Sequence, residues 1–153
     1  MRHGGPAPDN WEGSRETLEV SLTNSQIDQY RKGAVSGASP LQLVVMLYDG
    51  ALRFIEGGKR AMESGNRFVQ NEQLTRAQRI IAELMSCLDM DRGEEIAQNL
   101  LALYSFCYNK LVEANLEDNP EPLGQVVRVL GDLRASWSQL EAHLRQSESV
   151  KAA

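Results

Sequence analysis

The sequence predicts an all-α fold, an antiparallel four-helix bundle with a short additional helix before it. Leu, Ala, Glu, Gln and Arg dominate the 153 residues, and residue types that favour strands are sparse. Four long segments with helical spacing of apolar residues are separated by short breaks, which favour antiparallel packing of sequence neighbours. The expected organisation is a disordered arm (1–23), one helical domain (24–146) and a flexible tail (147–153).

The N-terminal arm contains glycines, prolines and charges around Trp11, its only large apolar side chain before Leu18. Such a composition buries too little apolar surface to order the chain. A short helix is expected after the arm, with Ile27 and Tyr30 on the same side. It is too short to be stable alone, so it has to pack against the rest of the protein.

The first long helix is expected from Pro40 to about Glu63. Ser39 can cap its free amides, and a proline suits the first helical position, where no amide is needed. Six of the seven residues from Leu41 to Leu47 are apolar, so the apolar surface runs round most of the helix. This helix therefore needs two partners, its own bundle and something on the outer side.

The second helix is expected from about Phe68 to Leu88. Its apolar residues recur at steps of three and four and form one stripe, namely Leu74, Ala77, Ile81, Leu84 and Leu88. Arg76, Arg79 and Glu83 are then expected to face water.

The third helix is expected to begin after Asp89 or Asp91, either of which can cap it. Its inward stripe is expected to contain Ile96, Leu100, Leu103, Cys107, Leu111 and Ala114. Further apolar residues cannot all join this stripe, namely Leu101, Tyr104, Tyr108 and Val112. A second apolar face is therefore expected on this helix as well.

The fourth helix is expected to begin at Pro120 and Pro122. Its apolar residues alternate spacings of three and four, as in a heptad seam, namely Leu123, Val126, Leu130, Leu133, Trp137, Leu140 and Leu144. The seam is too short for a dedicated coiled coil, so we interpret this helix as the one that closes the bundle.

The sequence shows no set of residues with the spacing of a catalytic site. The two histidines, His3 and His143, lack the spacing of a di-iron or zinc site. The acidic segment 89–95 lacks the ligand spacing of a calcium loop and suits helix capping better. Gly57 and Gly58 lie within a helix and are expected to permit close packing or bending. We therefore expect no enzymatic activity, no metal and no cofactor.

Charge and hydropathy argue against nucleic acid and membranes as partners. The 16 basic and 21 acidic residues give a net charge of -5, and no basic run occurs. The longest apolar run is far below the roughly 20 residues that span a bilayer, and no apolar leader is present, so a cytoplasmic location is expected. Cys87 and Cys107 have no metal or redox spacing and are expected to be reduced, buried thiols.

The surplus apolar surface of the first and third helices allows three interpretations. A polar-rimmed apolar patch on a helical bundle is typical of a groove for an extended or helical peptide. The surplus could instead pack inside the bundle, or form a homodimer. The residue pattern alone leaves these alternatives open.

Several motifs in series resemble the FliS family of flagellar secretion chaperones. The similarity runs from about Ile27 to Trp137. The motifs are Ala38-Ser39-Pro40-x-x-Leu43-Val44-x-Met46-Leu47-Tyr48-Asp49-Gly50-Ala51, Ala77-Gln78-x-Ile80-Ile81-x-Glu83-Leu84, Gly93-Glu94-x-Ile96-Ala97-x-Asn99-Leu100, Leu103-Tyr104 and Leu111-x-x-Ala114-Asn115. The chain departs from the family in its long N-terminal arm and at Cys107 and Tyr108.

The resemblance implies a cytoplasmic helical bundle that binds newly made flagellin at its disordered C-terminal segment. Such a chaperone prevents premature polymerisation and assists delivery to the flagellar type III export apparatus. In the family the flagellin segment wraps around the bundle and fills apolar grooves on the outside. Whether export-gate components, a co-chaperone or an anti-sigma factor also bind, and whether the chain is a monomer or a weak homodimer, is left open.

The resemblance and the surplus apolar surface together give a set of candidate flagellin-binding residues. They are Ile27, Tyr30, Leu41, Val44, Val45, Tyr48, Leu101, Tyr104, Tyr108, Val112 and Asn115. In relatives, the residues matching Ile27 and Tyr30 can cover part of the groove when no client is bound, and permanent core packing is the alternative. Asn115 could anchor the client backbone or cap its own helix. Asp49 and Gly50 are expected to shape helix packing.

Two other functions remain alternatives. The bundle could be a dimeric regulatory or structural protein that associates through the same apolar surface. It could also be a chaperone of another flagellar export substrate, such as a filament-cap or hook-associated protein.

Overall fold

The computed structural model describes residues 39–152, and these residues form four helices and no strand. The helices are α3 (Pro40–Glu63), α4 (Arg67–Ser86), α5 (Met90–Glu117) and α6 (Glu121–Ala152). The predicted all-α class is confirmed for this part of the chain. The N-terminal arm and the short helix with Ile27 and Tyr30 lie outside the described residues.

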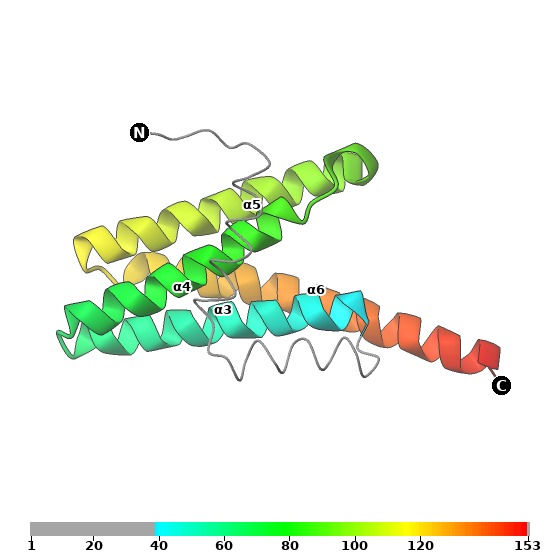
Figure 1. Cartoon of the computed structure of the whole chain (residues 1–153), viewed down its shortest axis with the longest axis horizontal. Helices are drawn as coiled ribbons and strands as arrows, with labels where there is room; N and C mark the ends of the chain where they lie inside the picture. The colour runs from blue at the N-terminus through cyan, green and yellow to red at the C-terminus, as the bar shows by residue number, and fades with distance from the viewer. Residues whose placement is uncertain (1–38, 153) are drawn as a thin grey trace.

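The four helices form a bundle in which each helix packs on two others. α3 and α5 each contact both α4 and α6, whereas the diagonal pairs have no close backbone approach. Figure 1 shows α3 and α4 side by side, and α6 extending past the other helices at its C-terminal end. None of the helices in residues 39–152 is long and apolar enough to cross a membrane.

The start of α3 follows the sequence prediction. The Ser39 hydroxyl accepts a hydrogen bond from the Gln42 amide, and the Gln42 side chain accepts one from the Ser39 amide, which makes a capping box. Pro40 occupies the first position of the helix. The chain then turns through Gly65, whose φ of 76° lies in the left-handed region that glycine adopts at little cost.

Two glycines allow α3 and α4 to approach closely. A Cβ atom at Gly58 would lie 2.5 Å from Cδ2 of the buried Leu74, and one at Gly57 would lie 2.5 Å from Oε1 of Gln73. Close packing, one of the two roles expected for these glycines, is confirmed. The two positions differ, because the Gln73 amide can move aside and the Leu74 side chain is enclosed by the core.

The core-facing side of α5 differs from the expected stripe. Cys107, Leu111 and Ala114 are buried as expected, but Ile96 is 70% exposed and Leu103 is 36% exposed. The helix is interrupted at Glu94, whose φ of 48° and ψ of -124° are not helical. This break lies two residues before Ile96.

The residues that replace Ile96 and Leu103 in the core are Ala97 and Tyr104, seven residues apart. Tyr104 can turn inward because its hydroxyl finds a hydrogen-bond partner there. On α4, the expectation that Glu83 faces water is also wrong. Its side chain is buried, and one carboxylate oxygen accepts a hydrogen bond from Cys87 Sγ at 3.7 Å.

The heptad seam of α6 changes its environment along the helix. Leu123, Val126 and Leu130 are buried, whereas Leu140 is 42% exposed and Leu144 is 47% exposed. The helix continues through the segment 147–152, which was expected to be a flexible tail and has helical backbone. Flexibility of this end stays a prediction.

Candidate functional site

The candidate binding residues lie on two diagonal helices of the bundle. Leu41, Val44 and Val45 are half-buried on the first two turns of α3. The candidates on α5 are also half-buried, namely Leu101, Tyr108, Val112 and Asn115. Because α3 and α5 make no close backbone contact, the structure does not bring these residues into one pocket. They form two separate outer surfaces.

Tyr48 and Tyr104 do not lie on either outer surface, which corrects their expected placement. Their side chains are 0% and 2% exposed, and the two hydroxyl oxygens are 2.5 Å apart. Trp137 of α6 donates a hydrogen bond from Nε1 to the Tyr48 hydroxyl at 3.1 Å. Burial raises the pKa of both tyrosines, so both hydroxyls stay protonated. This cluster joins three helices at the centre of the bundle.

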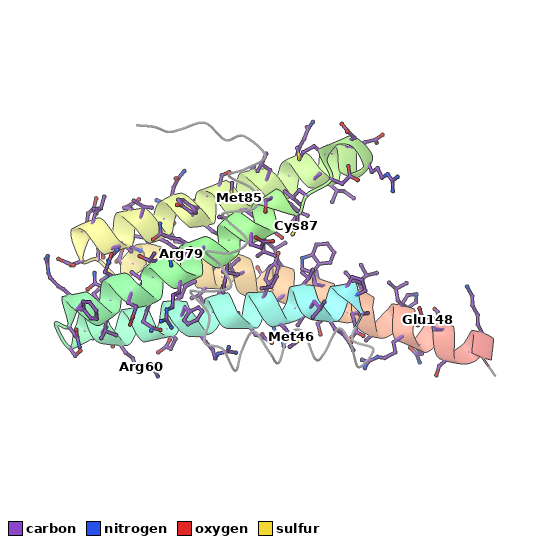
Figure 2. The ribbon with its side chains drawn as sticks, in the orientation of Figure 1. Met46, Arg60, Arg79, Met85, Cys87 and Glu148 are labelled. Atoms are coloured by element: carbon purple, nitrogen blue, oxygen red, sulfur yellow. The ribbon has the colours of Figure 1, made fainter. Side chains whose placement is uncertain are left out.

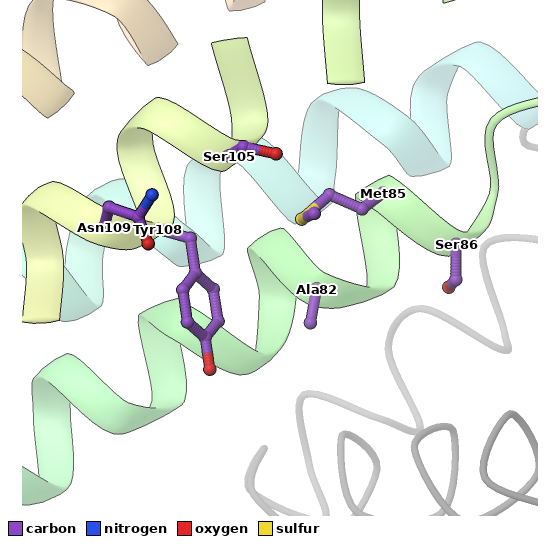
Figure 3. A pocket seen from close by; sticks show the side chains of 6 residues that line it. All are labelled: Ala82, Met85, Ser86, Ser105, Tyr108 and Asn109. Atoms are coloured by element: carbon purple, nitrogen blue, oxygen red, sulfur yellow. The ribbon is translucent and has the colours of Figure 1, made fainter. Parts of the chain in front are cut away.

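The outer surface on α5 borders a hollow of about 540 Å³ between α4 and α5. Its lining residues are Ala82, Met85, Ser86, Ser105, Tyr108 and Asn109. Figure 3 shows Tyr108 extending from α5 toward α4, with Met85 on the α4 side. Small and flexible side chains with one aromatic ring form a surface that can take an apolar side chain of a peptide.

The end of the α4/α5 surface is closed by a hydrogen-bonded network around Asn115. Gln70 donates from Nε2 to Asn115 Oδ1 and to Asp118 Oδ1, each at 3.0 Å. Asn115 donates from Nδ2 to Asn71 Oδ1 at 2.9 Å. The helix cap is Asp118, so the idea that Asn115 caps α5 is wrong. Its amide links α4 to α5, and a client would have to exchange these bonds.

A second apolar strip on α5 was missed by the sequence analysis. Leu103 and Phe106 are partly exposed, and Lys110 places its ammonium 5.7 Å from the centre of the Phe106 ring. Steps of three and four residues put this strip on a different side of α5 from Tyr108. The signal in the sequence was the excess of apolar residues on this helix, but Leu103 was assigned to the core.

Asp49 lies on α3 and has a structural role. Its carboxylate accepts hydrogen bonds from Nε and a terminal nitrogen of Arg134 on α6, at 2.5 and 3.3 Å. The pair is half-exposed, so its contribution to stability is modest. This geometry agrees with the expected role of Asp49 in helix packing.

A cluster of side chains suited to binding a metal ion is absent from the part of the chain that the structure describes. No group of three or more His, Cys, Asp or Glu side chains in residues 39–152 could hold a metal ion. Cys87 and Cys107 are thiols and are not joined in a disulfide, and burial raises the pKa of the Cys107 thiol to about 11. Cys87 was expected to be buried but is exposed at the end of α4 (Figure 2).

Comparison with known proteins points to one family. A family model described as "Flagellar protein FliS" matches residues 23–144. The "Flagellar secretion chaperone FliS" of Vibrio cholerae is 38% identical over 118 residues, which cover 74% of this chain and 87% of the relative. The relative of the same name from Bacillus subtilis is 36% identical over 110 residues, covering 72% of this chain and 81% of the relative. That of Salmonella typhimurium is 34% identical over 119 residues, covering 77% and 88%.

Proposed function

The chain belongs to the FliS family of flagellar proteins, and on that premise we propose that it is an export chaperone whose client is flagellin. Its curated relatives are named flagellar secretion chaperones, which agrees with the expectation of a chaperone and not an enzyme. The proposed client region is the disordered C-terminal segment of flagellin, which is held in the cytoplasm until export. Holding this segment prevents premature polymerisation and assists delivery to the flagellar type III export apparatus.

The observation that carries this proposal is the apolar hollow beside Tyr108 on the outside of the bundle. A disordered segment buries little surface by itself and gains stability by spreading along such a surface. The half-buried apolar residues at the start of α3 would offer a second contact. Two surfaces on diagonal helices fit a long segment that wraps around the bundle better than a compact ligand.

Short links between successive helices support the antiparallel order of the bundle, and Figure 1 shows the chain turning back after α3.

We further propose that the segment with Ile27 and Tyr30 forms an additional helix over part of the client surface. The client would displace these two side chains. Permanent packing of Tyr30 in the core is the competing interpretation, and it predicts a large loss of thermal stability for Tyr30→Ala.

Calorimetric titration with the C-terminal segment of the organism's own flagellin tests the proposal. We expect binding at micromolar concentrations or tighter. Tyr108→Ala should weaken binding about tenfold or more, because the ring would lose its burial against the client. Phe68→Ala is the matched control, since Phe68 is 78% exposed on α4 and is not among the proposed contacts.

Each other outcome argues for a different function. Failure of the wild-type chain to bind at micromolar concentrations would contradict the proposal. Binding of a filament-cap or hook-associated segment instead would identify another export substrate. If light scattering shows a concentration-dependent dimer that Tyr108→Ala disrupts, the same surface would be a self-association interface.

A further inference from the structure

One carboxylate in the last turn of α4, that of Glu83, is buried without a full set of partners. The residue is 8% exposed. Its Oε2 accepts a hydrogen bond from Sγ of Cys87, the residue that marks this end of α4 in Figure 2. Its Oε1 is buried and has no hydrogen-bond partner among the residues that the structure describes. A buried acceptor without a partner destabilises a folded protein, and the cost is larger for a carboxylate than for a neutral group.

Two further features of α4 make this position unfavourable for a carboxylate. The C-terminal end of a helix carries partial negative charge, so it repels an acidic side chain in the last turn. The last turn of α4 contains no basic residue that would offset this repulsion, and Arg79, one turn earlier, gives Oε1 no hydrogen bond. An apolar side chain of similar size would fit the same place at lower cost. A residue that lowers the stability of its own fold is typical of a functional position.

Glu83 faces α3 beside the proposed client surface. Arg76 of α4 places its guanidinium carbon 5.7 Å from the centre of the Phe54 ring of α3. The antiparallel order proposed above carries this register one heptad further, which sets Glu83 opposite Leu47. Leu47 and the candidate contact Val44, one turn before it, are half-buried and pack against the core. Glu83 therefore lies where α4 stops covering α3, next to the first turns of α3.

We propose that Glu83 is a client-binding residue, and that its Oε1 accepts a hydrogen bond from a backbone N–H group of the flagellin segment. This inference rests on the proposed function. A disordered segment brings unpaired N–H groups to the surface that it covers, and each needs an acceptor once water is excluded. A hydrogen bond to an ionised carboxylate is stronger than one to a neutral acceptor. Pairing in the complex would relieve the cost that Glu83 imposes on the free chaperone, so it would add to the affinity.

Replacement of the carboxylate should change stability and affinity in opposite directions. Glu83→Met keeps the length of the side chain and removes both oxygens. The Tm of this variant without client should equal or exceed that of the wild-type chain, because the only hydrogen bond lost is the weak one from Cys87. In calorimetric titration the same variant should bind the flagellin C-terminal segment about tenfold more weakly. A residue that only supports the fold would not give this pair of results.

Glu83→Gln tests which kind of donor the client supplies. Glutamine keeps a side-chain oxygen as an acceptor and loses the charge. A backbone N–H donor therefore predicts a smaller loss of affinity than in Glu83→Met. A cationic side chain of flagellin predicts equal losses in the two variants and a wild-type affinity that falls steeply with added salt. That second pattern would overturn the assignment of a backbone donor.

Two control variants separate the client from partners within the chain. Glu63→Met makes the same change at an exposed position at the other end of α3 and should leave the affinity unchanged. Arg79→Ala removes the basic residue one turn before Glu83 and should change neither Tm nor affinity. A loss of stability in both Arg79→Ala and Glu83→Met would mean that Glu83 pairs with Arg79 in solution, and it would overturn the inference.

The inference and the proposed function fail in different ways. A clear fall in Tm for Glu83→Met, or its failure to fold, would assign the carboxylate to the stability of the chain and overturn the inference. Wild-type affinity in Glu83→Met would also overturn it, because Oε1 would then have water as its only partner. In both cases flagellin still binds the wild-type chain. Failure of the wild-type chain to bind would contradict the proposed function itself.

Discussion

The two halves of α6 carry the same heptad pattern in different surroundings. In the first half, Leu123, Val126 and Leu130 are buried against the other helices. In the second half, Leu140 and Leu144 continue the pattern but are exposed. The spacing of apolar residues therefore predicts which face of a helix is apolar, but it does not predict whether another helix covers that face. In this protein the uncovered half lies beside the start of α3, where the chain outside the described residues joins the bundle.

Truncation of one leucine in each half should give the largest contrast. Leu130→Ala removes a fully buried side chain and should lower the free energy of unfolding by about 2 to 5 kcal/mol. Leu144→Ala should cost clearly less, because nearly half of the side chain already faces solvent. Urea denaturation of the two variants measures both values. Equal losses would mean that the second half of α6 is as well covered as the first.

The adjacent glycines of α3 repeat this contrast between an enclosed and an open position. Gly58→Ala should lower the free energy of unfolding by about 1 to 3 kcal/mol, because its methyl group would overlap the enclosed Leu74 side chain. Gly57→Ala should be neutral or slightly stabilising, since the Gln73 amide can rotate away and alanine favours the helix. Thermal unfolding followed by circular dichroism compares the pair. A larger loss for Gly57→Ala would contradict the described α3/α4 approach.

The tyrosine cluster lies where α6 passes from its covered to its uncovered half, and its removal should have a smaller effect. Tyr48→Phe removes the hydroxyl that contacts both Tyr104 and Trp137, and should cost about 1 to 2 kcal/mol. Tyr104→Phe removes only one of these two hydrogen bonds and should cost less. Chemical denaturation gives the stabilities, and near-ultraviolet circular dichroism of Trp137 reports the local change. A larger cost for Tyr104→Phe would place the hub of the cluster on α5 instead.

Patterns of residues close together in the sequence predicted where helices begin better than they predicted which face of each helix is buried. The Ser39 cap and Pro40 defined the start of α3, because capping depends on residues a few positions apart. The direction of Tyr104 could not be read in the same way, since it depends on a hydroxyl 56 residues earlier in the chain. The break at Glu94 carried no signal either, because a positive φ is unusual for this residue type.

The candidate site was predicted in part for the same reason. The surplus of apolar residues correctly marked α3 and α5 as helices with a partly uncovered side, and Tyr108 borders a hollow there. It did not separate Tyr48 and Tyr104, which the core encloses, from residues of the outer surface. Apolar character alone cannot distinguish these cases, because a buried tyrosine needs only one internal hydrogen-bond partner.

Methyl chemical shifts of the chain, recorded with and without the flagellin C-terminal segment, test the central claim most directly. The claim is that the client occupies the outer surfaces of α3 and α5 while the core stays closed. We predict that the methyl signals of Leu41, Val45, Leu101 and Val112 shift on binding, and that those of Leu74, Ile81 and Leu130 change little. Shifts concentrated in the buried residues, or no shifts at saturating segment, would contradict the account.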